Sequence, residues 1–249
     1  SYEGAVQIRR TATGELISSP PSQLGAINSI SFSPDSTMLI LGGRNGQLHF
    51  WDIAAGLVRG PILYHLAAVT YSDFSADGRT LIAFDGAIRR WQRAEGTRRG
   101  APLLHPGDVY TLAFSPDGKN LLTGGTDGKA RVWSTESGEQ LAELDQSGVV
   151  MVVAFSPNGT RALTAGHDRF SRIWDTSSWR IAARLELPYS KTMVTSSAAI
   201  SPDGELALTG VTDGTARLWD LKSGRQIGEP LQMSSPVRAV AFRPDGQVI

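Results

Sequence analysis

The chain has 249 residues, of which 41% are apolar, and its 24 basic side chains balance its 24 acidic ones. This composition is typical of a globular protein with an ample core. The zero balance creates no overall field that would attract nucleic acid or an anionic membrane, so we expect neither as a partner. The sequence contains no cysteine, which excludes disulfides and thiolate chemistry.

No apolar run approaches about 18 residues, so no membrane-spanning segment is predicted, and no signal peptide is visible. A chain without cysteine works in either redox compartment, and we take the cytoplasm as the expected location. The chain begins with Ser1 rather than Met and stops at Ile249 within an expected strand. We therefore expect residues 1–249 to be a single domain that belongs to a longer protein.

The N-terminal segment is expected to be the end of an incomplete first repeat. Residues 5–16 (AVQIRRTATGEL) align with residues 130–141 (ARVWSTESGEQL) through the shared Gly14 and Gly138, and Arg9 stands where the later segment has Trp133. This alignment predicts a third strand followed by the start of an outer strand.

Five complete repeats, called repeats one to five, follow this segment. They begin near Ile27, Val69, Val109, Val150 and Thr195. A sixth is expected to start at Val237 and to end after two strands.

The third repeat shows the plan most clearly. Residues 109–114 form an apolar run, which the sequence SPDG ends. Pro suits the second position of a β-turn, and Gly tolerates a positive φ. Apolar residues 121–123 follow, a second turn falls at 126–128, and residues 130–133 complete the pattern. We predict three strands here and a fourth after the turn at 135–138.

The same turn recurs along the whole chain at intervals of 40 to 45 residues. The apolar residue before each turn is Phe32, Phe74, Phe114, Phe155, Ile200 or Phe242. A tryptophan closes each complete repeat, at Trp51, Trp91, Trp133, Trp174 and Trp219. Six residues before these tryptophans stand Asn45, Asp85, Asp127, Asp168 and Asp213.

The first strand of a repeat has an irregular apolar spacing. Val109, Leu112 and Phe114 lie three and then two residues apart, whereas a regular strand would keep an even spacing. The odd step predicts a β-bulge near the start of the strand.

This pattern resembles the WD repeat family. The evidence is the 40–45 residue period, Trp-Asp pairs such as Trp51-Asp52, and four short strands per unit. The resemblance implies an all-β β-propeller of four-stranded antiparallel blades. It would have five complete repeats plus partial first and last repeats, and six or seven blades if the ring closes.

The predicted outer strands contain Pro61, Pro102 and Pro230. Proline is tolerated on an edge strand and blocks further pairing there. The Gly-x-Pro-Leu-like pattern around these residues is similar to the WD repeats of large bacterial signalling proteins.

Four residues of repeat three match the family's structural hydrogen-bond tetrad: His105, Thr123, Asp127 and Trp133. The resemblance implies that Asp accepts from His, that His bridges to the Thr hydroxyl, and that this hydroxyl meets the indole N–H. The same set could also be a catalytic triad, but we favour the structural interpretation because the indole already occupies the hydroxyl.

The other repeats complete this tetrad only in part. Repeat two has His65 but Ala83 in place of the hydroxyl, and Gln146 and Lys191 stand at the His position of repeats four and five. We therefore expect only repeat three to form the full network.

A local basic run, Arg89, Arg90, Arg93, Arg98 and Arg99, surrounds Trp91. We interpret it as a solvated outer rim. A contact for an acidic partner or nucleic acid is the alternative, although no aromatic platform accompanies the run.

The resemblance implies that a partner binds the narrow top face of the propeller. In each repeat the exposed positions there lie six and four residues before the apolar residue that precedes the first turn, such as Phe114. A third lies one residue before the Asp or Asn of the second turn, such as Asp127. Among them, large or charged side chains of types suited to binding stand at Arg44, Asp108, Tyr110, Met151, His167 and Arg238.

The leading functional hypothesis is a non-enzymatic scaffold that binds a protein or peptide on this face. One alternative is a regulatory or sensory domain of a larger bacterial signalling protein, such as a serine/threonine kinase. Another is a propeller enzyme with a site in a central channel. No cofactor or metal is expected, because the four histidines lie in different repeats without ligand spacing. Nothing in the sequence selects an oligomeric state.

Overall fold

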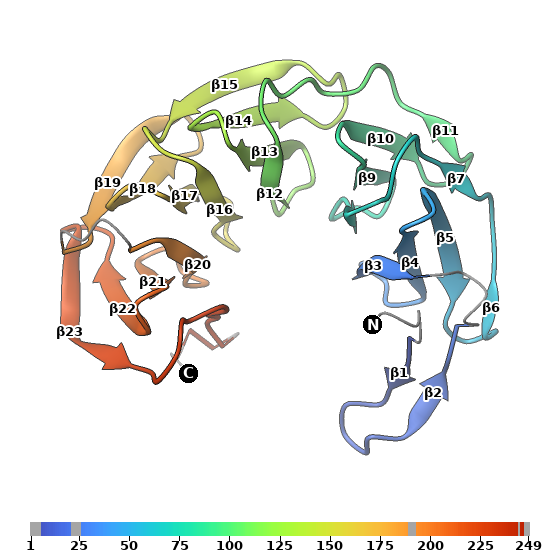
Figure 1. The fold of residues 1–249 in the computed structure, drawn as a ribbon, viewed down its shortest axis with the longest axis horizontal. Coiled ribbons are helices and arrows are strands. Elements are labelled where there is room, and N and C mark those ends of the chain that lie inside the picture. Colours follow the sequence, from blue (N-terminus) through green and yellow to red (C-terminus); the bar gives the residue numbers. More distant parts are fainter. Residues whose placement is uncertain (1–5, 21–25, 189–192, 244, 247–249) are drawn as a thin grey trace. The chain divides into compact units, whose positions relative to one another are not determined.

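The computed structural model describes residues 6–20, 26–188, 193–243 and 245–246. These residues form strands and turns and no helix, and hence no helix long and apolar enough to cross a membrane. The chain divides into two compact units, residues 1–104 and 105–249, which we describe separately (Figure 1). The single domain over residues 1–249 stays a prediction.

The first unit contains a two-stranded sheet, repeat one (residues 26–64) and repeat two (residues 65–98). The two-stranded sheet pairs β1 (Ile8–Arg9) with β2 (Leu16–Ser18), which confirms the predicted end of an incomplete repeat. Repeat one consists of β3 (Ile27–Phe32), β4 (Met38–Gly43), β5 (Gln47–Asp52), β6 (Leu57–Val58) and β7 (Leu63–Tyr64). Repeat two consists of β8 (Tyr71–Phe74), β9 (Thr80–Phe84), β10 (Ile88–Gln92) and β11 (Thr97–Arg98).

The second unit contains repeats three (105–145), four (146–186) and five (187–232), each a four-stranded antiparallel sheet in chain order. Repeat three has β12 (Val109–Phe114), β13 (Asn120–Gly125), β14 (Lys129–Ser134) and β15 (Gln140–Asp145). Repeat four has β16 (Val150–Phe155), β17 (Arg161–Gly166), β18 (Phe170–Asp175) and β19 (Arg180–Glu186). Repeat five has β20 (Thr195–Ile200), β21 (Leu206–Val211), β22 (Thr215–Asp220) and β23 (Arg225–Gln232).

The predicted bulge is confirmed near the start of the first strand in four repeats. The pairing register shifts between Ile27 and Ser29, between Val109 and Thr111, between Val150 and Val152, and between Thr195 and Ser197. In repeat three the extra residue keeps Val109 and Leu112 both buried, whereas in repeat one Ser29 is buried and Ile30 and Phe32 are exposed.

The segment predicted to open a sixth repeat differs from the expectation. Residues 237–243 form no strand in the structure, and residues 247–249, where the second strand was predicted, lie outside the described part of the chain. Val237 nevertheless docks on repeat five, because its N–H donates to the Val211 carbonyl at 3.2 Å. Without a described partner strand, the residues after Val237 have no ladder to complete.

Neighbouring repeats within a unit pack through their tryptophans. Trp174 of repeat four joins a buried cluster with Val132 and Leu144 of repeat three. Trp219 joins Ile173 and Leu185 of repeat four in the same way. Because a four-stranded sheet cannot bury both faces alone, these contacts between repeats supply the core.

A valine seated over a glycine marks three junctions between repeats. A Cβ added to Gly42, Gly124 or Gly210 would stand 2.8, 2.4 or 2.6 Å from a methyl carbon of Val69, Val150 or Val237. These distances are shorter than van der Waals contact, so only glycine lets the next repeat approach this closely.

Prolines interrupt the outer strand of repeats one and two. β6 and β7 both pair with β5 and are separated by residues that include Gly60 and Pro61. In repeat two, β11 ends before Pro102, and pairing resumes only as a bridge between Ile88 and Leu103. Proline has no N–H to donate to the ladder. In repeat five, β23 continues through Pro230, and its pairing with β22 shifts register between Ala216 and Leu218.

Candidate functional site

The tetrad of repeat three forms only in part. The Trp133 indole N–H donates to the Thr123 hydroxyl at 2.9 Å, as predicted. His105 Nδ1 lies 3.8 Å from Asp127 Oδ1, too far for a hydrogen bond. Among the described contacts none joins His105 to Thr123, so the predicted bridge between them is wrong.

An arginine explains this difference. Arg131 Nη1 lies 2.7 Å from Asp127 Oδ2 and 3.0 Å from His105 Nε2. Burial first, and then the Arg131 charge, lower the pKa of His105, so the imidazole is neutral near pH 7. A neutral imidazole accepts a hydrogen bond at only one nitrogen. His105 uses this nitrogen to accept from Arg131, so it cannot also accept from the Thr123 hydroxyl.

Repeat four forms the complete network instead, although Gln146 stands at its His position. Trp174 donates to the Thr164 hydroxyl at 2.9 Å, and this hydroxyl donates to Gln146 Oε1 at 2.5 Å. Gln146 Nε2 then donates to Asp168 Oδ1 at 2.7 Å. The prediction that only repeat three would be complete is therefore wrong, because a glutamine amide offers both the donor and the acceptor that the position requires.

The other tryptophans each meet a different environment. Trp219 donates to the Thr209 hydroxyl at 2.9 Å, while Lys191 lies outside the described residues. Trp51 donates to Ser18 of β2 at 3.1 Å. The buried Trp91 nitrogen has no hydrogen-bond partner among the described residues, because Ala83 replaces the hydroxyl.

Buried arginines paired with the turn Asp are a feature that the sequence analysis missed. Arg89, Arg131 and Arg172 each contact the Asp four residues earlier, at 3.0, 2.7 and 2.6 Å. The spacing Asp-x-x-x-Arg-x-Trp repeats in the sequence and could have revealed them. Each pair ties a turn to the third strand, and pairing offsets the cost of burying the two charges.

These contacts also correct the interpretation of the basic run as a solvated rim. Arg89 and Arg90 are only 8% and 3% exposed. Arg98 is exposed, and its guanidinium carbon lies 5.3 Å from the centre of the Trp91 ring. The run therefore combines buried structural arginines with exposed ones.

The predicted top-face positions lie beside one another within each repeat. The Thr126 N–H donates to the Asp108 carbonyl at 2.9 Å, and the His167 N–H donates to the Val149 carbonyl at 3.0 Å. In the first unit the Arg44 N–H donates to the Ala26 carbonyl at 2.8 Å. These bonds hold the loop before a repeat against the turn between its second and third strands.

The six candidate binding residues differ in exposure. Tyr110 is 58% exposed, and Arg44, Asp108, His167 and Arg238 are also exposed. Met151 is half-buried and packs against the core of repeats four and five. Arg44 lies in the first unit and the other five residues in the second. Their role as one binding surface stays a prediction.

The family profile of the WD domain, G-beta repeat (WD40) matches residues 14–52, 103–134, 138–175 and 187–220, more than half of the chain. The chain belongs to the WD40 family. No curated protein matches it in sequence. The WD40 match omits residues 53–102, which include repeat two with its shortened turn and its missing hydroxyl.

WD40 repeats are the blades of β-propellers, generally act as protein-interaction scaffolds and are typically non-enzymatic. The environment of Thr123 fits a structural role better than that of a nucleophile. Its side chain is fully buried and already accepts the Trp133 N–H. No group of three or more potential metal ligands occurs among the described WD40 residues.

Proposed function

We propose that this WD40 chain is a non-enzymatic interaction module that binds a protein or peptide through residues in and next to its loops. In the second unit these are the exposed Asp108, Tyr110, His167 and Arg238 and the half-buried Met151, and in the first unit the exposed Arg44. The observation that carries the proposal is the exposure of Tyr110, a 58% exposed aromatic beside a loop that backbone hydrogen bonds hold in place.

The residue types and their anchoring support this role. Tyrosine and arginine are enriched among residues that dominate binding energy, and methionine adapts to varied apolar partners. Because the loop positions are already tied by backbone bonds, little conformational entropy is lost when a partner orders them.

A peptide library selected on the purified chain tests the proposal. We expect Tyr110→Ala combined with Arg238→Ala to abolish binding of the selected peptides. Lys119→Ala combined with Lys222→Ala, two exposed residues outside these loops, serves as the matched control and should bind normally. If both double variants bind the peptides equally well and unfold at unchanged urea concentrations, Tyr110 and Arg238 are not part of the binding surface.

The regulatory alternative, a sensory domain of a larger bacterial signalling protein, has one supporting feature. The outer strands of repeats one and two break at Gly60-Pro61 and before Pro102, in the pattern that led to that resemblance. The full-length gene tests it, because a gene without a catalytic domain beside this segment ends the idea. The cytoplasmic location likewise stays a prediction.

A further inference from the structure

One residue of each β-bulge in the second unit stands outside the strand pairing. In β12 the register shifts between Val109 and Thr111, so Tyr110 between them has no pairing partner. Met151 of β16 and Ser196 of β20 are left out of the pairing in the same way. A bulge turns the side chain of its extra residue away from the regular alternation of the strand. Tyr110, Met151 and Ser196 therefore share one structural position in three successive repeats.

Arg238 occupies the corresponding position after repeat five. The residue before it, Val237, docks on repeat five at three points. Its side chain lies over Gly210, its N–H donates to the Val211 carbonyl at 3.2 Å, and its carbonyl accepts from the Ser196 hydroxyl at 2.6 Å. These contacts fix the backbone next to Arg238, although residues 237–243 form no strand.

The four positions form a row, because the inner strands of neighbouring repeats in this unit lie side by side. Figure 1 shows β12, β16 and β20 as the successive inner strands of their repeats. The Val153 N–H of β16 donates to the Thr111 hydroxyl of β12 at 3.3 Å, and Val152 of β16 shares a buried cluster with Ile200 of β20. The order along the row is Tyr110, Met151, Ser196 and Arg238.

The chemistry of this row changes along its length. It begins with the exposed aromatic ring of Tyr110, continues with the half-buried Met151 and ends with the exposed guanidinium of Arg238. Asp108, two residues before Tyr110, adds an exposed carboxylate at the first end. Apart from His167, Asp108 and Arg238 are the only ionisable acids or bases at the predicted top-face positions of the second unit. The row is therefore acidic at one end, apolar next to it and basic at the other end.

Neither of these two charges has a partner in the fold. Among the described residues, the Asp108 carboxylate and the Arg238 guanidinium form no ion pair or hydrogen bond. Asp213, in the neighbouring turn of repeat five, accepts instead from the Thr215 N–H and hydroxyl at 2.9 and 2.6 Å. In repeat three, Arg131 is paired with the turn Asp of its own repeat at 2.7 Å. Both ends of the row thus keep their charge for a ligand.

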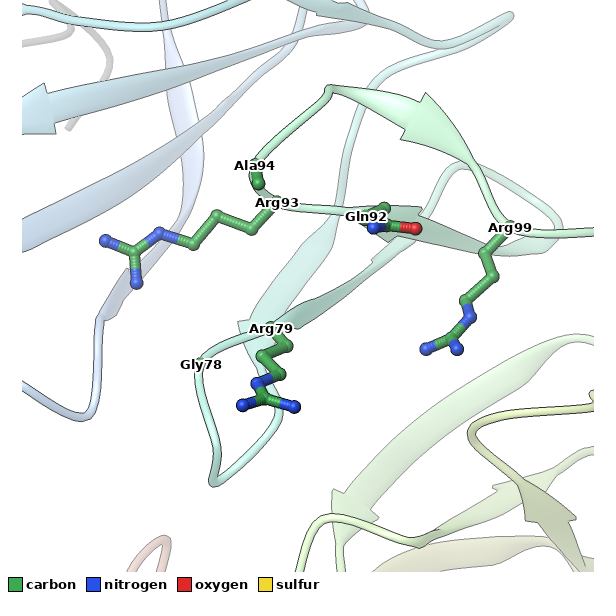
Figure 2. Close-up of a pocket in the computed structure, with 6 residues that line it drawn as sticks. All are labelled: Gly78, Arg79, Gln92, Arg93, Ala94 and Arg99. Carbon is green, nitrogen blue, oxygen red and sulfur yellow. The ribbon is translucent and has the colours of Figure 1, made fainter.

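The hollow of about 510 Å³ in repeat two differs from the row in this respect (Figure 2). Figure 2 shows Arg93 extending away from Arg79 and Arg99. Arg93 lies 3.9 Å from Asp35, and its guanidinium carbon is 5.3 Å from the centre of the Phe74 ring. Because the cation of this hollow is engaged by the protein itself, we place the ligand on the row.

We propose that this row binds an extended peptide with a basic residue at the Asp108 end, an apolar residue over Tyr110 and Met151, and an acidic residue at the Arg238 end. The inference rests on the proposed function, because it specifies the kind of peptide that these loops take. A guanidinium donates two parallel hydrogen bonds to a carboxylate, and tyrosine and methionine present apolar surface. A nucleic acid fits the row less well, since Asp108 repels its phosphates.

The length of the row sets the length of the peptide. Packed sheets lie about 10 Å apart, so the three steps from Tyr110 through Met151 and Ser196 to Arg238 span at most about 30 Å. An extended strand rises about 3.3 Å per residue, so about nine residues cover the row. Because the two ends of the row carry opposite charges, they also give the bound peptide a direction.

A random library of nine-residue peptides, selected on four forms of the whole chain, tests the charge order. The forms are the wild type, Asp108→Lys, Arg238→Glu and, as the matched control, Lys222→Glu, which reverses an exposed charge outside the row. Peptides selected on the wild type should be basic towards one end and acidic towards the other. Arg238→Glu should select peptides that are basic at both ends, and Asp108→Lys peptides that are acidic at both ends. Lys222→Glu should select the wild-type pattern.

Fluorescence anisotropy with the best wild-type peptide measures the size of the effect. The peptide should bind Arg238→Glu at least about tenfold more weakly than the wild type, and replacing its acidic residue by lysine should restore the affinity. Asp108→Lys should weaken the same peptide, and replacing its basic residue by glutamate should restore binding to that variant. All three substituted positions are exposed, so the urea midpoints of the variants should match that of the wild type.

The same charge pattern in all four selections would overturn the inference, and so would wild-type peptides without opposite charges at their ends. If Tyr110→Ala with Arg238→Ala abolishes binding while the charge pattern does not change among the selections, the proposed function stands and only the charge order fails. If no peptide is enriched on the wild type, the proposed function and the charge order both fail.

Discussion

Repeats four and two have the same strand order and the same closing tryptophan, yet they differ in the polar contacts of that tryptophan. In repeat four, hydrogen bonds run from Trp174 through Thr164 and Gln146 to Asp168. In repeat two, the indole nitrogen of Trp91 has no described partner, and its ring lies 5.3 Å from the ring of His65.

Both tryptophans are nevertheless buried, at 5% and 6% exposure. The polar network therefore does not place the ring. Apolar packing against the preceding repeat does, and the network adds local stability where the right side chains are present. Four substitutions or measurements can separate these two contributions.

The largest expected effect is that of Trp174→Ala, which removes the ring between repeats three and four. We expect the free energy of unfolding in urea to fall by about 3–5 kcal/mol. Trp174→Phe keeps much of the apolar contact and should lose less. A loss below about 1 kcal/mol for the alanine variant would contradict the packing role.

Gln146→Leu should have the next largest effect, about 1–3 kcal/mol, because Thr164 and Asp168 then lose their buried partner. Urea unfolding measures the loss. The matched change in repeat two, His65→Leu, should cost less, since neither His65 ring nitrogen has a hydrogen-bond partner among the described residues. Equal losses would show that the network in repeat four adds nothing.

A hydroxyl added to repeat two should recover part of the missing network. Ala83→Thr and Ala83→Val introduce side chains of nearly equal shape, so any packing strain is common to both. We expect the threonine variant to be more stable than the valine variant by about 1 kcal/mol, the net value of one hydrogen bond to Trp91. Equal urea midpoints would argue against this geometry.

The smallest expected effect depends on pH. Burial lowers the pKa of His65 from its ordinary 6.5, although Asp85 opposes the shift. The unfolded chain therefore binds this proton more readily, so stability is highest above pH 6.5 and falls as the pH drops below it. His65→Gln, which imitates repeat four, should make the fall of the unfolding midpoint below pH 6.5 shallower. A part of the fall should remain, because burial also lowers the pKa values of His49 and His105. An unchanged pH profile would exclude His65 as a source of the dependence.

Much of the fold could be predicted from the sequence because its signals are local. The run 109–114 and the turn after it coincide with β12 and its turn, and the three-then-two apolar spacing located the bulge. A bulge replaces the two-residue spacing of apolar residues by a three-residue spacing at one point of a strand. A single sequence is enough to show that change.

The polar contacts could not be predicted in the same way, because they depend on which of several polar side chains lies within hydrogen-bond distance in the folded protein. The resemblance required a histidine, so Gln146 went unrecognised, although an amide can both donate and accept. Conversely, repeat three has the expected His105, but its Nε2 contacts Arg131 instead of the Thr123 hydroxyl. The buried Arg89 and Arg90 were missed for a similar reason, since the run of five arginines does not show which ones the strands bury.

The valines seated over Gly42, Gly124 and Gly210 have a consequence for how such a chain changes in length. Besides the packing of the tryptophans, each of these three junctions places a branched residue against a glycine of the preceding repeat. Repeat three carries both residue types, Val109 at its start and Gly124 in its second strand, so copying it in frame would reproduce this contact. Repeats two and four carry Phe84 and Ala165 at the glycine position and would not.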